Sequence, residues 1–294
     1  MHAQQPLIQQ VTGSSDVYLI LGDPVEQVRA PESLNRVFAH LGIDAVLVPI
    51  HLAPRDLKTF VKTAFMAKNI KGMWVTIPHK TSIMDVLDDD TPLAHVAGAV
   101  NAVRRTASGR IEGALFDGEG FVASLDYYAI AYAGKRVLVL GAGGAAAAIG
   151  ASLACTSQNA VAELAFFDPA AGRAQALAAR LGKAARTRVC AVDNNDAAGF
   201  DLVINASPLG LKLSDPLPCD VGHMEPHAAL VDILMKNQPT PLLRAARARG
   251  LVAQPGFEMM ILQTHLYLDF FGFTDAAAVV RKDADFIRQT FYPT

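Results

Sequence analysis

The stretch VLVLGAGGAA, residues 137–146, carries the clearest fold signal in this chain. An apolar run enters a glycine-rich turn, and an alanine-rich run follows directly. Gly141 permits a tight turn after a strand, and Gly143 lets a backbone approach a pyrophosphate. The N-terminus of the following helix then offers free N–H groups to the phosphates. We therefore expect a strand–turn–helix unit that binds a nucleotide.

The same unit suggests which residues hold the cofactor. The phosphate contacts are assigned to the turn residues Gly141, Ala142, Gly143, Gly144 and Ala145. The next predicted strand, Glu163–Phe167, ends at Asp168, whose carboxylate would bind a ribose hydroxyl and repel a 2′-phosphate. We therefore expect NAD rather than NADP, with Arg173 as the residue that would bind a 2′-phosphate instead. Asp168-Pro169 also fits a helix N-cap, and both roles can hold together.

Strand-like and helix-like runs alternate on both sides of this turn, which predicts a parallel α/β architecture. The predicted strands are Val17–Leu21, Ala45–Pro49, Gly72–Ile77, Arg136–Leu140, Glu163–Phe167, Leu202–Asn205, Leu230–Ile233 and Leu251–Ala253. The predicted helices include Pro31–Leu41, Leu57–Ala67, Gly141–Ser152, Gly172–Leu181, Pro241–Arg249 and one long amphipathic helix, Phe257–Phe271. Asp85–Asp90 looks like an acidic helix end, and Ser108-Gly109 predicts a hairpin.

Length and composition narrow the class of protein. A chain of 294 residues exceeds a usual domain of about 100–200 residues, so two domains are expected. We place them at residues 1–120 plus 256–294, and at residues 121–255. With 51% hydrophobic and 18% charged residues, the chain is not of a disordered type. A net charge of −2 offers no field for nucleic acid or an anionic membrane, so the expected partner is a small molecule.

Other residue patterns are weak. Three widely spaced cysteines form no C-x-x-C pair and predict free thiols in a reducing compartment: Cys155, Cys190 and Cys219. The start, MHAQQPLIQQ, does not resemble a secretory signal, so a cytoplasmic location is expected. His223 and His227 are four apart, but Pro226 between them predicts a loop, so no metal site is expected.

Several motifs occur in a recognisable order. They are VTIPHK at 75–80, AGAVN at 97–101, GALFDG at 113–118, INASPLG at 204–210, and Gln263. This order and spacing resemble the shikimate dehydrogenase family, from about Tyr18 to Gly272. The resemblance implies an N-terminal α/β substrate domain and a Rossmann dinucleotide-binding domain, with a cleft between them.

The resemblance also implies residue roles. Lys80 and Asp117 match the catalytic pair that moves a proton during hydride transfer, a task for which a carboxylate can aim a lysine ammonium. Positions that contact the substrate match Thr76, Asn101 and Gln263. Positions on the nicotinamide side of the cofactor match Ser207, Pro208, Ile233 and Gly256. Taken alone, each of these residue types is more often structural.

One segment departs from the family. The resemblance implies a motif Asn-Pro-…-Ser-x-Ser-Pro whose two serines bind the substrate carboxylate, but here residues 23–31 read DPVEQVRAP. Val28 and Ala30 therefore stand where the serines should be, a loss of about 3–6 kcal/mol of binding at ~1.5–3 kcal/mol per charged hydrogen bond. Arg29 or Gln27 could replace them, because a guanidinium can bind a carboxylate through two hydrogen bonds.

Further departures make the expected site more apolar: Trp74, Leu115, Phe116 and Met235. We therefore expect a dehydrogenase for a cyclic hydroxy acid or alcohol related to shikimate or quinate, with a best substrate other than shikimate. Two alternatives stay open. One is an NAD(H)-binding regulatory or redox-sensing protein without turnover, and the other is an ordinary shikimate or quinate dehydrogenase in which Arg29 does the work of the serines. The architecture is compatible with a homodimer.

Overall fold

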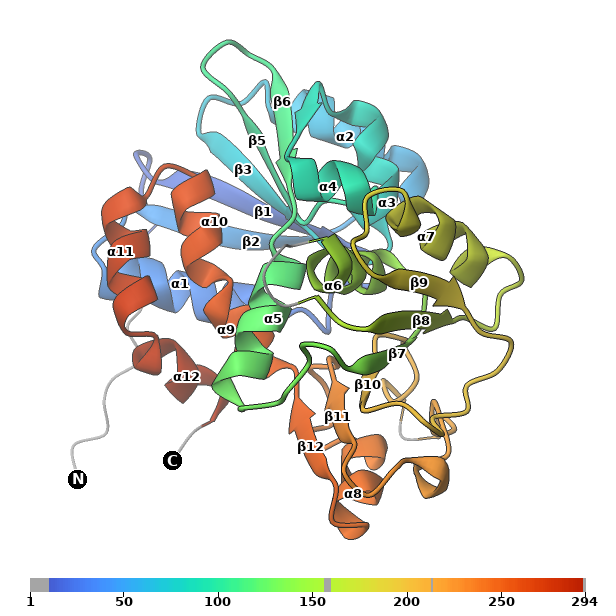
Figure 1. Ribbon diagram of the computed structural model, residues 1–294. Coiled ribbons are helices and arrows are strands. Elements are labelled where there is room, and N and C mark those ends of the chain that lie inside the picture. Colours follow the sequence, from blue (N-terminus) through green and yellow to red (C-terminus); the bar gives the residue numbers. More distant parts are fainter. Residues whose placement is uncertain (1–10, 156–159, 213, 293–294) are drawn as a thin grey trace, which may run out of the picture. The chain divides into compact units, whose positions relative to one another are not determined.

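The computed structural model describes residues 11–155, 160–212 and 214–292. They form two compact units, each built on a six-stranded sheet (Figure 1). The first unit covers the described chain up to Asp90, then Val100–Ala114, and the described residues from Thr264 onward. The second covers Thr91–Ala99 and the described residues of Leu115–Gln263. The chain changes unit at 114/115 and 263/264, near but not at the expected domain boundaries, which stay a prediction.

The sheet of the first unit is mixed. Its strands are β1 (Asp16–Gly22), β2 (Ala45–His51), β3 (Ile70–Val75), β4 (Asp89–Asp90), β5 (Ala102–Arg105) and β6 (Ile111–Ala114), in the order β2-β1-β3-β5-β6-β4. The predicted hairpin is confirmed as the antiparallel pair β5–β6. The predicted acidic helix end 85–90 is correct only at its start, since Asp85 lies in a short 3₁₀ helix, Ile83–Val86, whereas Asp89 and Asp90 form a strand. Asp89–Asp90 pairs with β6 because the backbone and the carboxylate of Asp88 both bond to Ile111.

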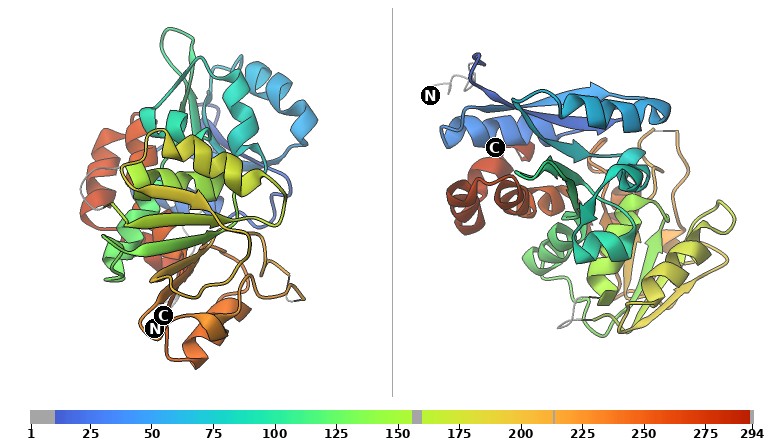
Figure 2. Two further views of the ribbon diagram at one scale, coloured as in Figure 1. Left: turned by 45° about the vertical axis from the view of Figure 1, so that its right-hand side comes forward. Right: turned by 90° about the horizontal axis from the view of Figure 1, so that it is seen from above.

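The α-helices of the first unit are α1 (Ala30–His40), α2 (Leu57–Ala64), α3 (His79–Ser82), α10 (Thr264–Phe270), α11 (Thr274–Lys282) and α12 (Asp285–Phe291). Aromatic side chains from some of these helices pack on the sheet and fill the core of the unit. Tyr18 of β1 packs on Phe38 of α1, with ring centroids 5.9 Å apart. Trp74 of β3 stacks on Tyr267 of α10 at 5.0 Å. Helices α1 and α10 therefore cover the same face of this sheet (Figure 2).

The predicted long helix 257–271 is two helices. One is α9 (Phe257–Leu262) in the second unit, and the other is α10, which starts at Thr264 in the first unit. Helix α9 packs against α5, whereas α10 packs on the ring of Trp74. The two pieces therefore belong to different cores, which a continuous apolar pattern does not reveal.

The sheet of the second unit is entirely parallel. Its strands are β7 (Arg136–Leu140), β8 (Glu163–Phe167), β9 (Arg188–Ala191), β10 (Leu202–Asn205), β11 (Ala229–Asp232) and β12 (Val252–Pro255). Their order in the sheet is β12-β11-β10-β7-β8-β9. If the strands are renumbered so that β7 is strand 1, the order from β9 across to β12 is 3-2-1-4-5-6. That is the strand order of the Rossmann fold. The predicted α/β class is confirmed.

Helices cover this parallel sheet. They are α4 (Pro92–Ala97), α5 (Asp117–Tyr127), α6 (Gly144–Cys155), α7 (Arg173–Gly182), α8 (Pro241–Ala248) and α9. Helices α6 and α7 pack on the β7–β8–β9 part of the sheet, and α8 packs on β11 and β12 (Figure 2). Strand β9 was not expected from the sequence. Within the described residues, no helix has the length and hydrophobicity needed to span a bilayer.

Candidate functional site

The glycine turn joins β7 to α6 in the second unit. Gly141 has φ +110°, and a Cβ there would lie 2.8 Å from the carbonyl oxygen of Ala206. At Gly143 the nearest atom to such a Cβ is 3.9 Å away, on the guanidinium of Arg173. Helix α6 begins at Gly144 rather than at Gly141. The turn is therefore tightly packed at its first glycine and open at its second, where a phosphate could approach the backbone.

Asp168 holds this turn together. Its carboxylate accepts hydrogen bonds from the N–H groups of Ala142 and Ala170, both at 2.9 Å. Arg173 lies 3.6 Å from the same carboxylate, which is only 8% exposed, whereas Arg173 is 56% exposed. The N-cap of α7 is Gly172, so the expected capping role of Asp168 is wrong. Backbone donors occupy both oxygens, and a cation stands beside the open glycine.

A buried network fixes the loop after β10. The Asn205 side chain accepts hydrogen bonds from the N–H and Oγ of Ser207, at 3.1 and 2.7 Å. It also donates to the buried Asp232 at 3.0 Å. Burial raises the pKa of Asp232, while hydrogen bonds from Thr240, Leu234 and Asn205 act in the opposite direction. Ser207 is therefore held in place by its neighbours, and the next residue, Pro208, is exposed.

The last two cofactor positions touch one another. A Cβ on Gly256 would lie 2.6 Å from the Cα of Ile233, so only glycine fits there without a backbone shift. Ile233 directly follows the carboxyl end of β11, and Gly256 directly follows that of β12. In the same way, the glycine turn comes after β7 and Ser207 comes after β10. Ligands of open parallel sheets bind at this edge. The predicted cofactor residues thus share one edge of one sheet.

Two further predicted residues lie on the neighbouring helices α5 and α9. Asp117 is the first residue of α5 and is buried. A Cβ on Gly120 would lie 2.4 Å from the carbonyl oxygen of Met259 and 2.8 Å from the Cβ of Gln263. Helices α5 and α9 therefore approach closely because Gly120 has no side chain. Gln263, at the end of α9, lies at this contact, and Asp117 lies one turn before Gly120 on α5.

The first unit holds the other predicted residues. The N–H of Val75 bonds to the carbonyl of Asn101 at 2.8 Å, and the N–H of Val100 bonds to the carbonyl of Lys80 at 2.9 Å. Thr76 follows Val75 at the end of β3. The backbones of Thr76, Lys80 and Asn101 are thus adjacent at the carboxyl end of that strand.

His79 fixes the start of the Lys80 turn. The side chain is fully buried, and its Nε2 donates to the carbonyl of Leu52 at 2.8 Å. Burial lowers the pKa of His79. The imidazole is therefore a buried group that holds the start of this turn against Leu52.

Segment 23–31 runs beside the same turn. The N–H of Asp23 bonds to the carbonyl of Ile77 at 3.0 Å. Gln27 donates its amide to the carbonyl of Pro24 at 2.7 Å. Arg29 pairs with Glu32 at 2.8 Å and lies over the ring of Phe291. Both side chains therefore have partners within the protein, and the expectation that Arg29 or Gln27 replaces the missing serines stays a prediction.

Two of the apolar residues that we expected to line the site are buried in the protein core. Trp74 is 3% exposed and packs among the rings of α10, and Leu115 is 1% exposed. Both are core residues of their own units. Phe116 and Met235 are half-buried.

Sequence reasoning missed the pair formed by Asp23 and His51. His51, the last residue of β2, donates its Nε2 hydrogen to Asp23 Oδ1 at 2.8 Å. The two side chains are 34% and 54% exposed. The sequence signal for this pair was Asp23 itself, because the family motif has an Asn at that position.

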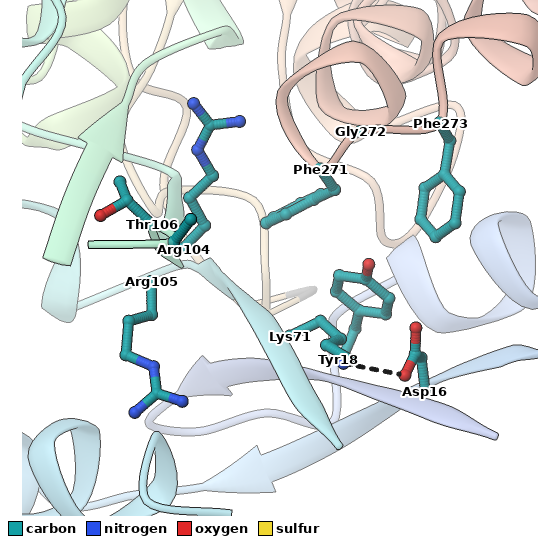
Figure 3. Close-up of a pocket in the computed structure, with 10 residues that line it drawn as sticks. Asp16, Tyr18, Lys71, Arg104, Arg105, Thr106, Phe271, Gly272 and Phe273 are labelled. Carbon is teal, nitrogen blue, oxygen red and sulfur yellow. Dashed lines mark ion pairs between the residues drawn. The ribbon is translucent and has the colours of Figure 1, made fainter. Parts of the chain in front are cut away.

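A hollow of about 500 Å³ lies at the opposite end of β1 and β3, where these strands begin (Figure 3). Lys71 in its wall pairs with Asp16 at 3.5 Å, and Arg104 pairs with Glu112 at 2.7 Å. None of the predicted site residues lines it. The hollow is therefore separate from the predicted site within this unit.

The histidines and cysteines considered from the sequence are placed as follows. In the described parts of the chain, no three His, Cys, Asp or Glu side chains are grouped so that they could hold a metal ion. His223 pairs with Asp196, and His227 pairs with Asp201. The three cysteines are free thiols, and burial raises the pKa of Cys219 to about 12.

Comparison with known proteins identifies relatives. A family model described as the shikimate dehydrogenase substrate binding domain matches residues 20–103. A shikimate dehydrogenase (NADP(+)) of Rubrobacter xylanophilus is 34% identical over 260 residues, covering 87% of this chain and 90% of that protein.

Solved structures agree with this. The quinate dehydrogenase of Corynebacterium glutamicum in complex with NAD is 27% identical, with a TM-score of 0.78 over 94% of this chain and 98% of that one. The ligand-free 5-ketofructose reductase of Gluconobacter sp. is 26% identical, with a TM-score of 0.77 over 92% and 99%.

The comparisons correct the cofactor expectation. Four curated relatives at 34–37% identity are all named shikimate dehydrogenase (NADP(+)), which points to NADP and overturns the preference for NAD. The structure gives a physical reason. Asp168 was expected to repel a 2′-phosphate, but its charge is offset by two backbone N–H groups and by Arg173 at 3.6 Å.

Proposed function

Because this chain belongs to the shikimate dehydrogenase family of oxidoreductases, we propose that it is an NADP-dependent dehydrogenase. Its proposed substrate is a cyclic hydroxy acid or alcohol related to shikimate, interconverted with the corresponding ketone. The observation that carries the proposal is the glycine turn, open at Gly143 on the ligand-binding edge of a Rossmann sheet, in a chain that keeps Lys80 and Asp117.

The proposed roles follow from the chemistry. The nicotinamide of NADP gives or takes a hydride at the substrate carbon. Lys80 and Asp117 move the accompanying proton to or from the oxygen on that carbon, the usual task of a general acid and base. Thr76, Asn101 and Gln263 hold the substrate through hydrogen bonds.

The cofactor is held by residues of the second unit. The proposed phosphate contacts come from residues 141–145, and those near the nicotinamide from Ser207, Pro208, Ile233 and Gly256. Arg173 is the proposed partner of the 2′-phosphate, because its guanidinium is exposed and lies beside the open glycine.

The proton-transfer proposal predicts a loss of turnover. Reduced-nicotinamide absorbance would be followed with a panel of cyclic hydroxy acids and alcohols. Lys80→Met and Asp117→Asn should each lower kcat by about 100-fold or more, the size of a general acid–base contribution. Thermal unfolding of each variant checks that it is folded. Turnover near the wild-type rate in a folded variant would exclude that residue from the mechanism.

The cofactor proposal predicts a selective change in KM. Arg173→Ala should raise the KM for NADP about 10- to 100-fold, the value of one hydrogen bond to a charged group, and change the KM for NAD much less. Arg188→Ala, an exposed arginine on β9, is the matched control and should change neither KM. Equal changes for both cofactors in Arg173→Ala would contradict the assignment.

A second function is favoured by one observation: the side chains of Val28 and Ala30 have no hydrogen-bond donors, and those of Gln27 and Arg29 already bond to Pro24 and Glu32. The chain could bind a dinucleotide as a regulatory or redox-sensing protein without turnover. Calorimetric binding of the cofactor together with no hydride transfer to or from any substrate in the panel would establish that function. Measurable turnover would exclude it.

A further inference from the structure

Asp23 lies beside the turn that carries Lys80. Its N–H bonds to the carbonyl of Ile77 at 3.0 Å, and the carbonyl of the preceding Gly22 accepts from Leu52 at 3.0 Å. The carbonyl of Leu52 in turn accepts from His79, the residue before Lys80. These bonds lie within one compact unit and place Asp23 next to Thr76 and Lys80 at the carboxyl end of the strands.

The carboxylate of Asp23 is oriented and accessible. His51 donates to its Oδ1 at 2.8 Å, and the Asp23 side chain is 34% exposed. Among the residues that the structure describes, none donates a hydrogen bond to its Oδ2. A carboxylate has about four acceptor positions, so this group can accept a hydrogen bond from a ligand hydroxyl while His51 keeps it in place.

The same segment is unsuited to an anionic group. The side chains of Val28 and Ala30 have no donors, and Gln27 and Arg29 are engaged with Pro24 and Glu32. A substrate carboxylate here would face the Asp23 carboxylate, and like charges at short range repel, while the guanidinium of Arg29 is paired with Glu32.

We propose that Asp23, oriented by His51, is a specificity-determining residue that accepts a hydrogen bond from a neutral hydroxyl group of the substrate. The substrate class is then a neutral cyclic polyol and its hydroxy ketone, not a hydroxy acid. This inference rests on the proposed dehydrogenase function and narrows it. Asp23 is an acceptor for substrate binding and takes no part in proton transfer.

The test compares shikimate with its neutral analogue in which a hydroxymethyl group replaces the carboxylate, at saturating NADP. The wild-type protein should have a kcat/KM for this alcohol at least 10-fold above that for the acid. Asp23→Asn should lower kcat/KM for the alcohol about 10- to 100-fold, mainly through KM, because an acceptor charge is lost. It should not lower kcat/KM for the acid, so the ratio between the two substrates falls. Glu26→Gln removes a charge from an exposed position on the same turn and should leave the ratio unchanged.

The outcomes separate the inference from the function on which it rests. A wild-type preference for the acid, or an unchanged ratio in folded Asp23→Asn, would overturn the inference. If neither compound is oxidised, the proposed function fails for this substrate pair, and calorimetry decides the inference on its own. Binding of the neutral alcohol at least 10-fold tighter than binding of the acid then supports it, whereas equal binding or no binding of either compound overturns it.

Discussion

Gly141 and Gly143 are two residues apart in one turn, but their surroundings differ. Gly141 combines a positive φ with a backbone carbonyl 2.8 Å from its missing Cβ. Gly143 has neither constraint, since the nearest atom to its missing Cβ is 3.9 Å away. The first glycine is therefore required for folding of the turn. The second is required only if a ligand approaches it.

Alanine substitutions should separate these two roles. Gly141→Ala should destabilise the protein by about 1–3 kcal/mol, the cost of strained backbone and a backbone clash. Gly143→Ala should leave the melting temperature almost unchanged but weaken NADP binding about 10-fold or more, because a methyl group would occupy the phosphate approach. Thermal unfolding and calorimetric titration measure the two effects. Similar melting temperatures for both variants would contradict the distinction, as would unchanged NADP affinity in Gly143→Ala.

At the scale of elements, helix α5 has a central position in the second unit. A Cβ on Gly118 would lie 2.1 Å from the carbonyl oxygen of Ala148 in α6, and Gly120 faces α9 in the same way. Two glycines in one helix normally weaken it, by about 1 kcal/mol each relative to alanine. Here they allow α6 and α9 to approach α5 closely, next to Asp117.

This packing predicts a large effect for a small substitution. Gly118→Ala should lower the free energy of unfolding by about 1–3 kcal/mol, because the obstructing atom belongs to backbone that cannot rotate away. Gly182→Ala is the matched control, since that glycine ends α7 with no atom within 4 Å of its missing Cβ. It should be neutral or stabilising by up to about 1 kcal/mol. Chemical denaturation compares them, and equal stability of the two variants would contradict the packing argument.

At the scale of the whole molecule, stability depends on keeping buried groups uncharged. His79 is fully buried and its pKa is lowered by that burial. In the unfolded chain a histidine has a pKa of about 6.5. As the pH falls through that value, the unfolded state binds a proton that the folded state does not, so the folded state loses stability. Above that pH the contribution is complete.

Replacing His79 should therefore make the free energy of unfolding depend less strongly on pH in the acidic range. The wild-type free energy of unfolding should fall between pH 7.5 and 5.5, by up to about 1.4 kcal/mol per pH unit from one group. His79→Gln can still donate to Leu52 and cannot take up a proton, so its decline should be smaller. Urea denaturation at the two pH values measures the difference. An equal decline in both proteins would show that His79 is not the group responsible.

Local patterns in the sequence determined much of the second unit. The predicted strands Glu163–Phe167 and Leu202–Asn205 occur at the expected residues, because a short apolar run bounded by turn residues is a local signal. The glycine turn was recognised by its spacing, and the motif order identified the family that the comparisons confirm.

Only the tertiary structure decided what the side chains of several of these residues contact. Trp74 was expected to line the site, yet it packs on the ring of Tyr267, and Arg29 and Asp168 have partners that the sequence does not predict. The apolar pattern of residues 257–271 likewise divides between two cores, and His51 reaches Asp23 from another strand. Helix period, turns and motif spacing depend on neighbours along the chain and can be inferred from it. Hydrogen-bond and ring partners depend on residues far apart in sequence, so they are fixed only when the chain has folded.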